Sequence, residues 1–121
     1  MPFADELGPV VLVAYGDSWA LAYDELAMSL RSLELAERGA IDHVGSTSIT
    51  GLVAKDVIDI QIRLRAIDAN AIVPCFESAG YRRRPELWNN EEASRGGPEV
   101  KLVFAPPVGA RACNVHVRRE G

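Results

Sequence analysis

The sequence predicts a mixed α/β or α+β domain with four or five strands and two helices. Short β-branched runs alternate along the chain with two stretches of helical periodicity. Gly and Pro residues mark the ends of these elements. The 121 residues, 48% of them hydrophobic, are enough for one packed core, so we expect a single domain over residues 1–121.

The first third of the chain predicts one strand followed by one helix. Residues 10–14, VVLVA, form a β-branched run that suits an edge strand. Asp17 or Ser18 can cap the helix, and Gly39 is its expected C-terminal stop. Apolar residues recur through this helix at three- and four-residue steps, and we expect them in the core: Trp19, Tyr23, Leu26, Leu30 and Leu33.

The rest of the chain predicts the remaining strands and the second helix. Strands are expected over residues 41–44, 57–64, 100–107 and 112–120. Residues 66–81 have helical character, with Asp68 as cap, Pro74 early in the helix or at a new turn, and Gly80 at the end.

The segment 81–98, YRRRPELWNNEEASRGGP, is polar and rich in turn residues, so we expect an extended loop. Its arginines could bind phosphate beside Tyr81 and Trp88. Glu91 and Glu92 favour instead a solvated loop with internal salt bridges, which is the interpretation we prefer for Arg82, Arg83 and Arg84.

Charge and composition exclude several classes of partner. The net charge is -4 with a pI near 5.1, and the charged residues are spread along the chain, so we expect no binding to duplex nucleic acid or to membranes. The N-terminus lacks the pattern of a signal peptide, and a cytoplasmic location is expected. Cys75 and Cys113 match no zinc or dithiol spacing, and we expect both as reduced, buried thiols.

The loop after the strand 41–44 has the composition of a phosphate-binding turn. Gly45 permits a sharp turn, and backbone N–H groups together with the hydroxyls of Ser46, Thr47 and Ser48 could bind phosphate oxygens. Lys55 would add a positive charge. The spacing is not that of a Walker A loop, in which the Lys directly follows the second Gly.

Asp59 interrupts the apolar strand that follows this loop. A buried carboxylate without a partner costs a few kcal/mol, so Asp59 needs a hydrogen-bond donor or a metal ion. Mg²⁺ bound to Asp59 could bridge to the same phosphates. The alternative from the residues alone is an ordinary polar turn, with Lys55 on the surface and Asp59 hydrogen-bonded within the sheet.

The string HVGSTSITGLVAKDVIDIQIRL, residues 43–64, resembles the signature of the GrpB family, His-[IV]-Gly-Ser-Thr-[AS]-[IV]-Pro-Gly-Leu-x-Ala-Lys-Pro-x-[IV]-Asp-[IL]. Three flanking strings resemble other parts of that family: VAYGDSWALAYDEL, SAGY and NVHVRREG. The resemblance therefore covers residues 13–121.

The resemblance implies a nucleotidyltransferase-like α+β fold with a mixed or antiparallel sheet of four to five strands. It implies that Gly45 and Ser46 bind the triphosphate of a nucleoside triphosphate and that Asp59 binds Mg²⁺, with Ser46 and Asp59 as the catalytic residues. The acceptor of the nucleoside monophosphate would be an unknown small molecule with a hydroxyl group.

The chain departs from that pattern at the second metal-binding acid. Nucleotidyltransferases usually have Asp-x-[Asp/Glu], because alternate residues of a strand share one face, whereas this chain has Gln61 after Asp59. His116 could supply a nitrogen ligand, which suits Mn²⁺ or Zn²⁺ better than Mg²⁺, but a hydrogen-bonded structural histidine is the interpretation we prefer. His43 is expected to support the loop through a ring hydrogen bond.

Two further departures are local, and one concerns the end of the chain. The family's two prolines are replaced by Thr50, which frees the loop, and by Asp56, which places a negative charge beside Lys55. Family members usually continue into an Arg-rich segment and a helix. We therefore expect a naturally short chain or a fragment, which could form a homodimer.

Three functions fit these observations. The first is a metal-dependent nucleotidyltransferase. The second is a nucleotide-binding or regulatory module without turnover, related to the domain fused to some dephospho-coenzyme A kinases. The third is a domain that uses the fold only for protein interaction.

Overall fold

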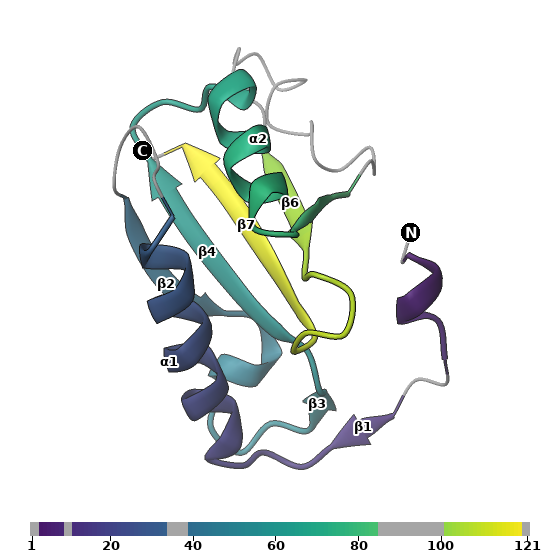
Figure 1. The fold of residues 1–121 in the computed structure, drawn as a ribbon. Coiled ribbons are helices and arrows are strands. Elements are labelled where there is room, and N and C mark those ends of the chain that lie inside the picture. The colour runs from purple at the N-terminus through teal and green to yellow at the C-terminus, as the bar shows by residue number, and fades with distance from the viewer. Residues whose placement is uncertain (1–2, 9–10, 34–38, 85–100, 120–121) are drawn as a thin grey trace.

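The computed structural model describes residues 3–8, 11–33, 39–84 and 101–119. These residues form an α+β fold whose centre is a five-stranded mixed sheet of order β2-β4-β7-β6-β5 (Figure 1). The strands in that order are Ala40–Val44, Ile58–Leu64, Cys113–Arg119, Leu102–Ala105 and Arg82–Arg83. Strands β4 and β7 are parallel, and the other neighbours are antiparallel. The fold class predicted from the sequence is confirmed.

Both helices, α1 (Ser18–Arg31) and α2 (Ala69–Ser78), cover the same face of the sheet (Figure 1). The alternating sequence IDIQIRL of β4 explains this arrangement, since every second residue is buried. Buried apolar residues from each of α1, α2, β4, β6 and β7 join in one hydrophobic cluster. Trp19 lies in that cluster with 1% of its surface exposed, as predicted.

The opposite face of the sheet is polar along β4 and β7. Asp59, Gln61 and Arg63 alternate with the buried residues of β4, and Asn114 and His116 do the same in β7. Direct pairing of Asp59 with Asn114 and of Gln61 with His116 places these side chains on one face. This polar face is where the candidate site lies.

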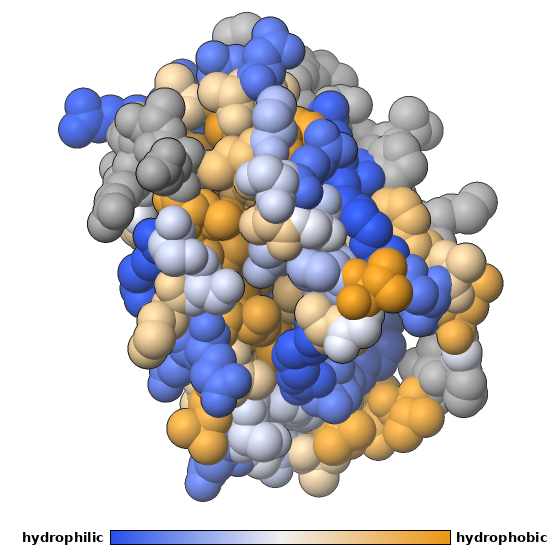
Figure 2. Space-filling model, in the orientation of Figure 1, coloured by the Kyte–Doolittle hydropathy of each residue, from blue (hydrophilic) through white to orange (hydrophobic). Residues whose placement is uncertain are grey.

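A second, two-stranded sheet lies beside the main one. It pairs β1 (Leu12–Val13) with β3 (Ala54–Lys55) in antiparallel register. Strand β1 falls inside the predicted strand 10–14. Figure 2 shows apolar side chains gathered over β1 and β3, and the exposed apolar residues there are Val11, Leu12, Val13, Leu52 and Val53.

The end of the first helix differs from the sequence prediction. Helix α1 ends at Arg31 rather than near Gly39, and residues 34–38 lie outside the described part of the chain. Ser32 closes the helix, because both its N–H and its hydroxyl donate to the carbonyl oxygen of Ser29. Leu33, expected on the helical stripe, therefore follows the helix.

The second helix begins at the predicted cap. The Asp68 carboxylate accepts a hydrogen bond from the N–H of Asn70 at 3.1 Å. Pro74 lies inside α2 without ending it, and Gly80 follows the helix with φ +90°. No described helix combines the length and the apolar character needed to cross a bilayer.

The prediction of a solvated loop over residues 81–98 was wrong for its first residues. Arg82–Arg83 forms β5, which pairs with β6, and the N–H of Arg84 donates to the carbonyl oxygen of Val103. Arg84 is 8% exposed. Trp88, Glu91 and Glu92 lie outside the described residues. Both cysteines are free thiols, as expected, but Cys75 is only half-buried whereas Cys113 is buried.

Candidate functional site

The site begins where β2 ends, because Gly45 turns the chain directly against Asp59. Val44 pairs with Asp59 across the β2–β4 ladder. Gly45 then adopts φ 75° and ψ -169°, a backbone conformation that is essentially restricted to glycine. A Cβ at this position would lie 2.6 Å from Asp59 Oδ2. The absence of a side chain thus allows the loop backbone to approach the carboxylate.

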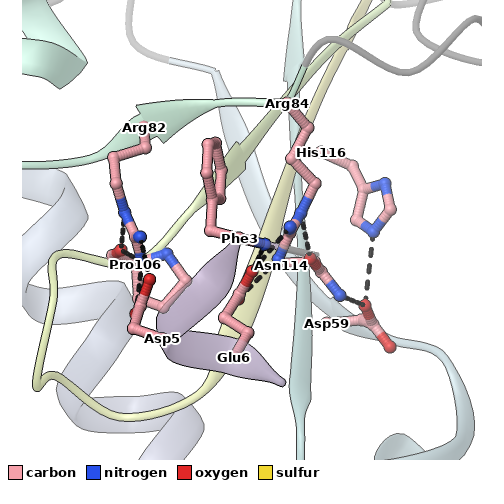
Figure 3. Close-up of polar contacts among 9 residues, drawn as sticks. All are labelled: Phe3, Asp5, Glu6, Asp59, Arg82, Arg84, Pro106, Asn114 and His116. Atoms are coloured by element: carbon pink, nitrogen blue, oxygen red, sulfur yellow. Dashed lines mark hydrogen bonds and ion pairs between the residues drawn. The ribbon is translucent and has the colours of Figure 1, made fainter. Parts of the chain in front are cut away.

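Two side chains of β7 contact the same carboxylate oxygen. Asn114 Nδ2 donates to Asp59 Oδ1 at 3.3 Å, and His116 Nε2 lies 3.3 Å from that oxygen (Figure 3). The side chains of Asp59 and His116 are 28% and 19% exposed. Asp59 therefore has hydrogen-bond partners and is still accessible to solvent, and the sequence requirement that it be partnered is met.

The loop that follows forms a short 3-10 helix, η2 (Ser46–Ser48), in which the three hydroxyl groups have different surroundings. Ser46 is exposed. Ser48 is exposed too, but its hydroxyl donates to the carbonyl oxygen of Gly45 at 2.6 Å. Thr47 is 2% exposed, and its hydroxyl lies 2.9 Å from His43 Nε2. Ser46 is thus the hydroxyl most accessible to a ligand.

His43 lies on the helix-covered face, opposite Asp59. It pairs with Ile60, whose side chain is buried on that face, and its ring stacks on Tyr23 of α1 with centroids 4.8 Å apart. Burial lowers the pKa of His43, so the neutral imidazole is favoured. His43 contacts the loop through Thr47 alone among the described hydrogen bonds.

Lys55 lies on a strand next to the loop, and Gln61 lies on the strand of Asp59. Lys55 is exposed in β3, a strand that contacts η2. Gln61 lies two residues beyond Asp59 on the same face, paired with Asp42 of β2 and His116 of β7. The polar face thus combines Asp59, Gln61 and His116, as the strand periodicity requires.

Asp56, next to Lys55, is paired with other groups. Its carboxylate accepts hydrogen bonds from Arg111 and, at 2.8 Å, from Nε1 of Trp19. The Arg111 guanidinium, followed by the Trp19 indole, lowers the pKa of Asp56. The negative charge that the sequence places beside Lys55 is therefore offset by Arg111.

Asn114 and the two residues that support it, Arg84 and Glu6, were not predicted from the sequence. Asn114 Oδ1 accepts from Arg84 Nε at 2.9 Å, and the Arg84 guanidinium donates to both carboxylate oxygens of Glu6 at 2.9 and 2.8 Å (Figure 3). Glu6 ends the N-terminal 3-10 helix η1 (Ala4–Glu6). The alternation of β7 could have identified Asn114, two residues before His116, but no local pattern links Arg84 to Glu6.

The donor atoms limit the metal that this site could hold. Within the described residues, no group of three or more His, Cys, Asp or Glu side chains is arranged to hold a metal ion. Asp59 is the carboxylate nearest the loop, and Asn114 turns an N–H rather than its oxygen toward it. Mg²⁺ requires oxygen ligands in octahedral geometry. One carboxylate beside an imidazole does not fit a two-metal centre, and a single cation there would need further oxygen ligands from a bound molecule.

Comparison with known proteins agrees with this fold. The model of the family described as GrpB protein matches residues 9–121. The UPF0157 protein BH1888 of Halalkalibacterium halodurans is 36% identical over 90 residues, covering 72% of this chain and 46% of that protein. A dephospho-CoA kinase of Mycolicibacterium paratuberculosis is 30% identical over 145 residues, covering all of this chain and 36% of the kinase.

The fold is also similar to that of a solved structure. The crystal structure of conserved protein GrpB from Enterococcus faecalis has a TM-score of 0.68 and 24% identity, covering 90% of this chain and 61% of that one. The chain spans less than half the length of the two curated relatives above. Since the family model matches nearly every residue from 9 onward, the chain belongs to the GrpB family.

Proposed function

We propose that this chain is a nucleotidyltransferase-like protein that binds a nucleoside triphosphate between the Gly45 loop and Asp59. The observation that supports it is the contact of Gly45 with the Asp59 carboxylate at adjoining strand ends. That contact places exposed loop backbone and one accessible carboxylate side by side, as binding of a phosphate and its counter-ion requires.

The phosphates would bind to the loop. The N–H groups of Ser46 and Thr47 have no backbone acceptor among the described residues, and the Ser46 side chain is exposed. Lys55 on the adjacent strand β3 would contribute positive charge. Ser48 would support the loop through its bond to the Gly45 carbonyl oxygen.

Asp59 would hold one Mg²⁺ or Mn²⁺ ion together with the phosphate oxygens. Such an ion would neutralise charge on those oxygens while an acceptor hydroxyl of a small molecule forms a bond to the α-phosphorus and pyrophosphate leaves. His116, at 3.3 Å from the carboxylate, makes Mn²⁺ the better probe, because imidazole is a good ligand for softer divalent ions.

A nucleotide-binding or regulatory module without turnover is the second candidate. The neutral side chains of Gln61 and Asn114 on either side of the single site carboxylate favour it. The similarity to part of a dephospho-CoA kinase is compatible with such a role. If the lack of a second acid weakens metal binding and so prevents turnover, Gln61→Asp should strengthen metal-dependent nucleotide binding, since position 61 shares the face of Asp59.

Thermal unfolding tests the proposal, because a ligand that binds only the folded state raises its stability by about 2.7 kcal/mol at one hundred times its Kd. ATP, CTP, GTP and UTP would each be added with and without Mg²⁺ or Mn²⁺. We expect a metal-dependent rise in Tm that is lost in Asp59→Ala and reduced in Lys55→Ala. Lys101→Ala, a loss of the same charge just before β6, is the control. No shift at millimolar nucleotide with either metal would contradict the proposal.

A further inference from the structure

We infer that Arg84 is a positioning residue for Asp59 and that it acts through Asn114. The inference rests on the proposed function only in treating Asp59 as the carboxylate of the ligand site. Arg84 touches neither Asp59 nor the loop in any described hydrogen bond. Its Nε–H instead donates to the Asn114 side chain, which donates to Asp59 (Figure 3).

Arg84 determines which end of the Asn114 carboxamide faces Asp59. The Nε–H group of arginine can only donate, so it requires the oxygen of the carboxamide on its side. The Nδ2 group is then directed at Asp59 Oδ1. A flipped carboxamide would place two donors together at Arg84 and two acceptors together at Asp59, losing both hydrogen bonds.

Arg84 is itself held rigidly. Its side chain is 9% exposed, and its backbone N–H donates to the carbonyl oxygen of Val103 at 2.8 Å. The remaining guanidinium nitrogens form a two-pronged ion pair with Glu6, which fixes the plane of the guanidinium group. The consequence is a continuous chain of hydrogen bonds from Glu6 through Arg84 and Asn114 to Asp59.

A second arginine on the same face provides a matched control. Arg82 pairs with Asp5 as Arg84 pairs with Glu6, and both guanidinium groups lie over the Phe3 ring, at 4.6 and 5.8 Å. Within the described part of the chain, Arg82 also donates to the carbonyl oxygen of Pro106, and none of its hydrogen bonds there reaches Asn114. Breaking this pair disturbs the N-terminal segment without breaking the path to Asp59.

A double-mutant cycle tests whether Arg84 acts on Asp59 through Asn114. The dissociation constant for ATP with Mn²⁺ would be measured by calorimetry for the full chain and for Arg84→Lys, Asn114→Ala, their combination and Arg82→Lys. Residues that hydrogen-bond to a metal-ligating side chain typically contribute about tenfold or more to affinity. We therefore expect Arg84→Lys and Asn114→Ala each to weaken binding by about tenfold. The combination should weaken it no further, because Arg84 acts through Asn114. Arg82→Lys should change affinity by less than about twofold.

Two results would overturn the inference while the proposed function stands: equal losses in Arg84→Lys and Arg82→Lys, or additive losses in the combined variant. A merely structural role for Arg84 predicts such additivity. If the unaltered chain binds no nucleotide, the proposed function fails, and the inference is then tested by a measurement that needs no ligand.

That measurement is the NMR spectrum of the Asn114 side-chain amide. One of its two Nδ2 protons is directed at Asp59, so we expect the signal of that proton to be shifted downfield and to exchange slowly with solvent. Arg84→Lys should move that signal back upfield and speed its exchange, whereas Arg82→Lys should leave both its shift and its exchange rate unchanged. An Asn114 amide signal that does not respond to Arg84→Lys would overturn the inference.

Discussion

Gly45 and Asp59 meet at the end of the β2–β4 ladder, where a Cβ on Gly45 would lie 2.6 Å from the carboxylate oxygen Oδ2. Asp59 is held from the other side by Asn114 and His116 of β7. The carboxylate thus lies between a loop that only glycine can form and two polar side chains of the neighbouring strand. Substitutions at these residues should therefore change the stability of the fold or its affinity for nucleotide.

Gly45→Ala should destabilise the protein and displace Asp59. Its backbone conformation costs a residue with a side chain about 1–3 kcal/mol, and the contact with Asp59 adds to that cost. Gly51→Ala is the matched control, because Gly51 has φ 85° but a Cβ there would meet nothing within 4 Å. Urea unfolding should show the larger loss for Gly45→Ala. Equal losses would mean that the approach to Asp59 is not constrained.

Asp59→Asn should remove the metal-dependent part of nucleotide binding, since the amide keeps the shape of the side chain but loses its charge. Asp42→Asn is the control from the neighbouring strand. Asp42 pairs with Arg63 at 3.2 Å, and both side chains are more than 40% exposed, so its loss should cost about 0–1 kcal/mol. Comparable effects of the two variants on nucleotide affinity would argue against Asp59 as the site carboxylate.

The Glu6–Arg84 pair should contribute stability that depends on pH. The hydrogen bond from Arg84 lowers the pKa of Glu6 below its ordinary value of 4.5. The contribution is therefore fully present above pH 4.5 and is lost as the pH falls through the folded-state pKa. Glu6→Gln should thus reduce the free energy of unfolding at neutral pH and have progressively less effect in acid. A constant difference across the pH range would refute the coupling.

Cys113 should resist alkylation in the folded protein, whereas Cys75 should react. Burial raises the pKa of the Cys113 thiol to about 12, so roughly one molecule in ten thousand is thiolate at pH 8. Cys75 is half-buried. Mass spectrometry after iodoacetamide treatment should find Cys75 modified in native protein and both modified in denaturant. Rapid native modification of Cys113 would show that β7 opens readily.

The strands and the central carboxylate were predictable from local pattern. The alternation in IDIQIRL and CNVHVRR defines one buried and one polar face, and it places Asp59, Gln61 and His116 together. The same alternation could have added Asn114. The end of α1 was less predictable, because Ser32 closes the helix through its own hydroxyl whereas the periodic apolar pattern continues to Leu33.

The ion pair between Glu6 and Arg84, which supports the site through Asn114, could not be predicted from local pattern. Glu6 and Arg84 are 78 positions apart, and nothing near either residue identifies the other. Their pairing is a product of tertiary structure, in which η1 contacts the short strand β5 and the segment that follows it. His43 is a different case: its place directly before the loop suggested support for the site, and its pairing with Ile60 decides that this support comes from the helix-covered face.

Paramagnetic broadening by Mn²⁺ with ATP would locate the proposed metal site, since Mn²⁺ broadens NMR signals of nearby residues and Mg²⁺ with ATP is a diamagnetic control. We expect loss of backbone amide signals around Gly45, Asp59 and Asn114, with the signals retained in Asp59→Asn. Broadening centred elsewhere on the protein, or none at saturating Mn²⁺ and ATP, would contradict the proposed site.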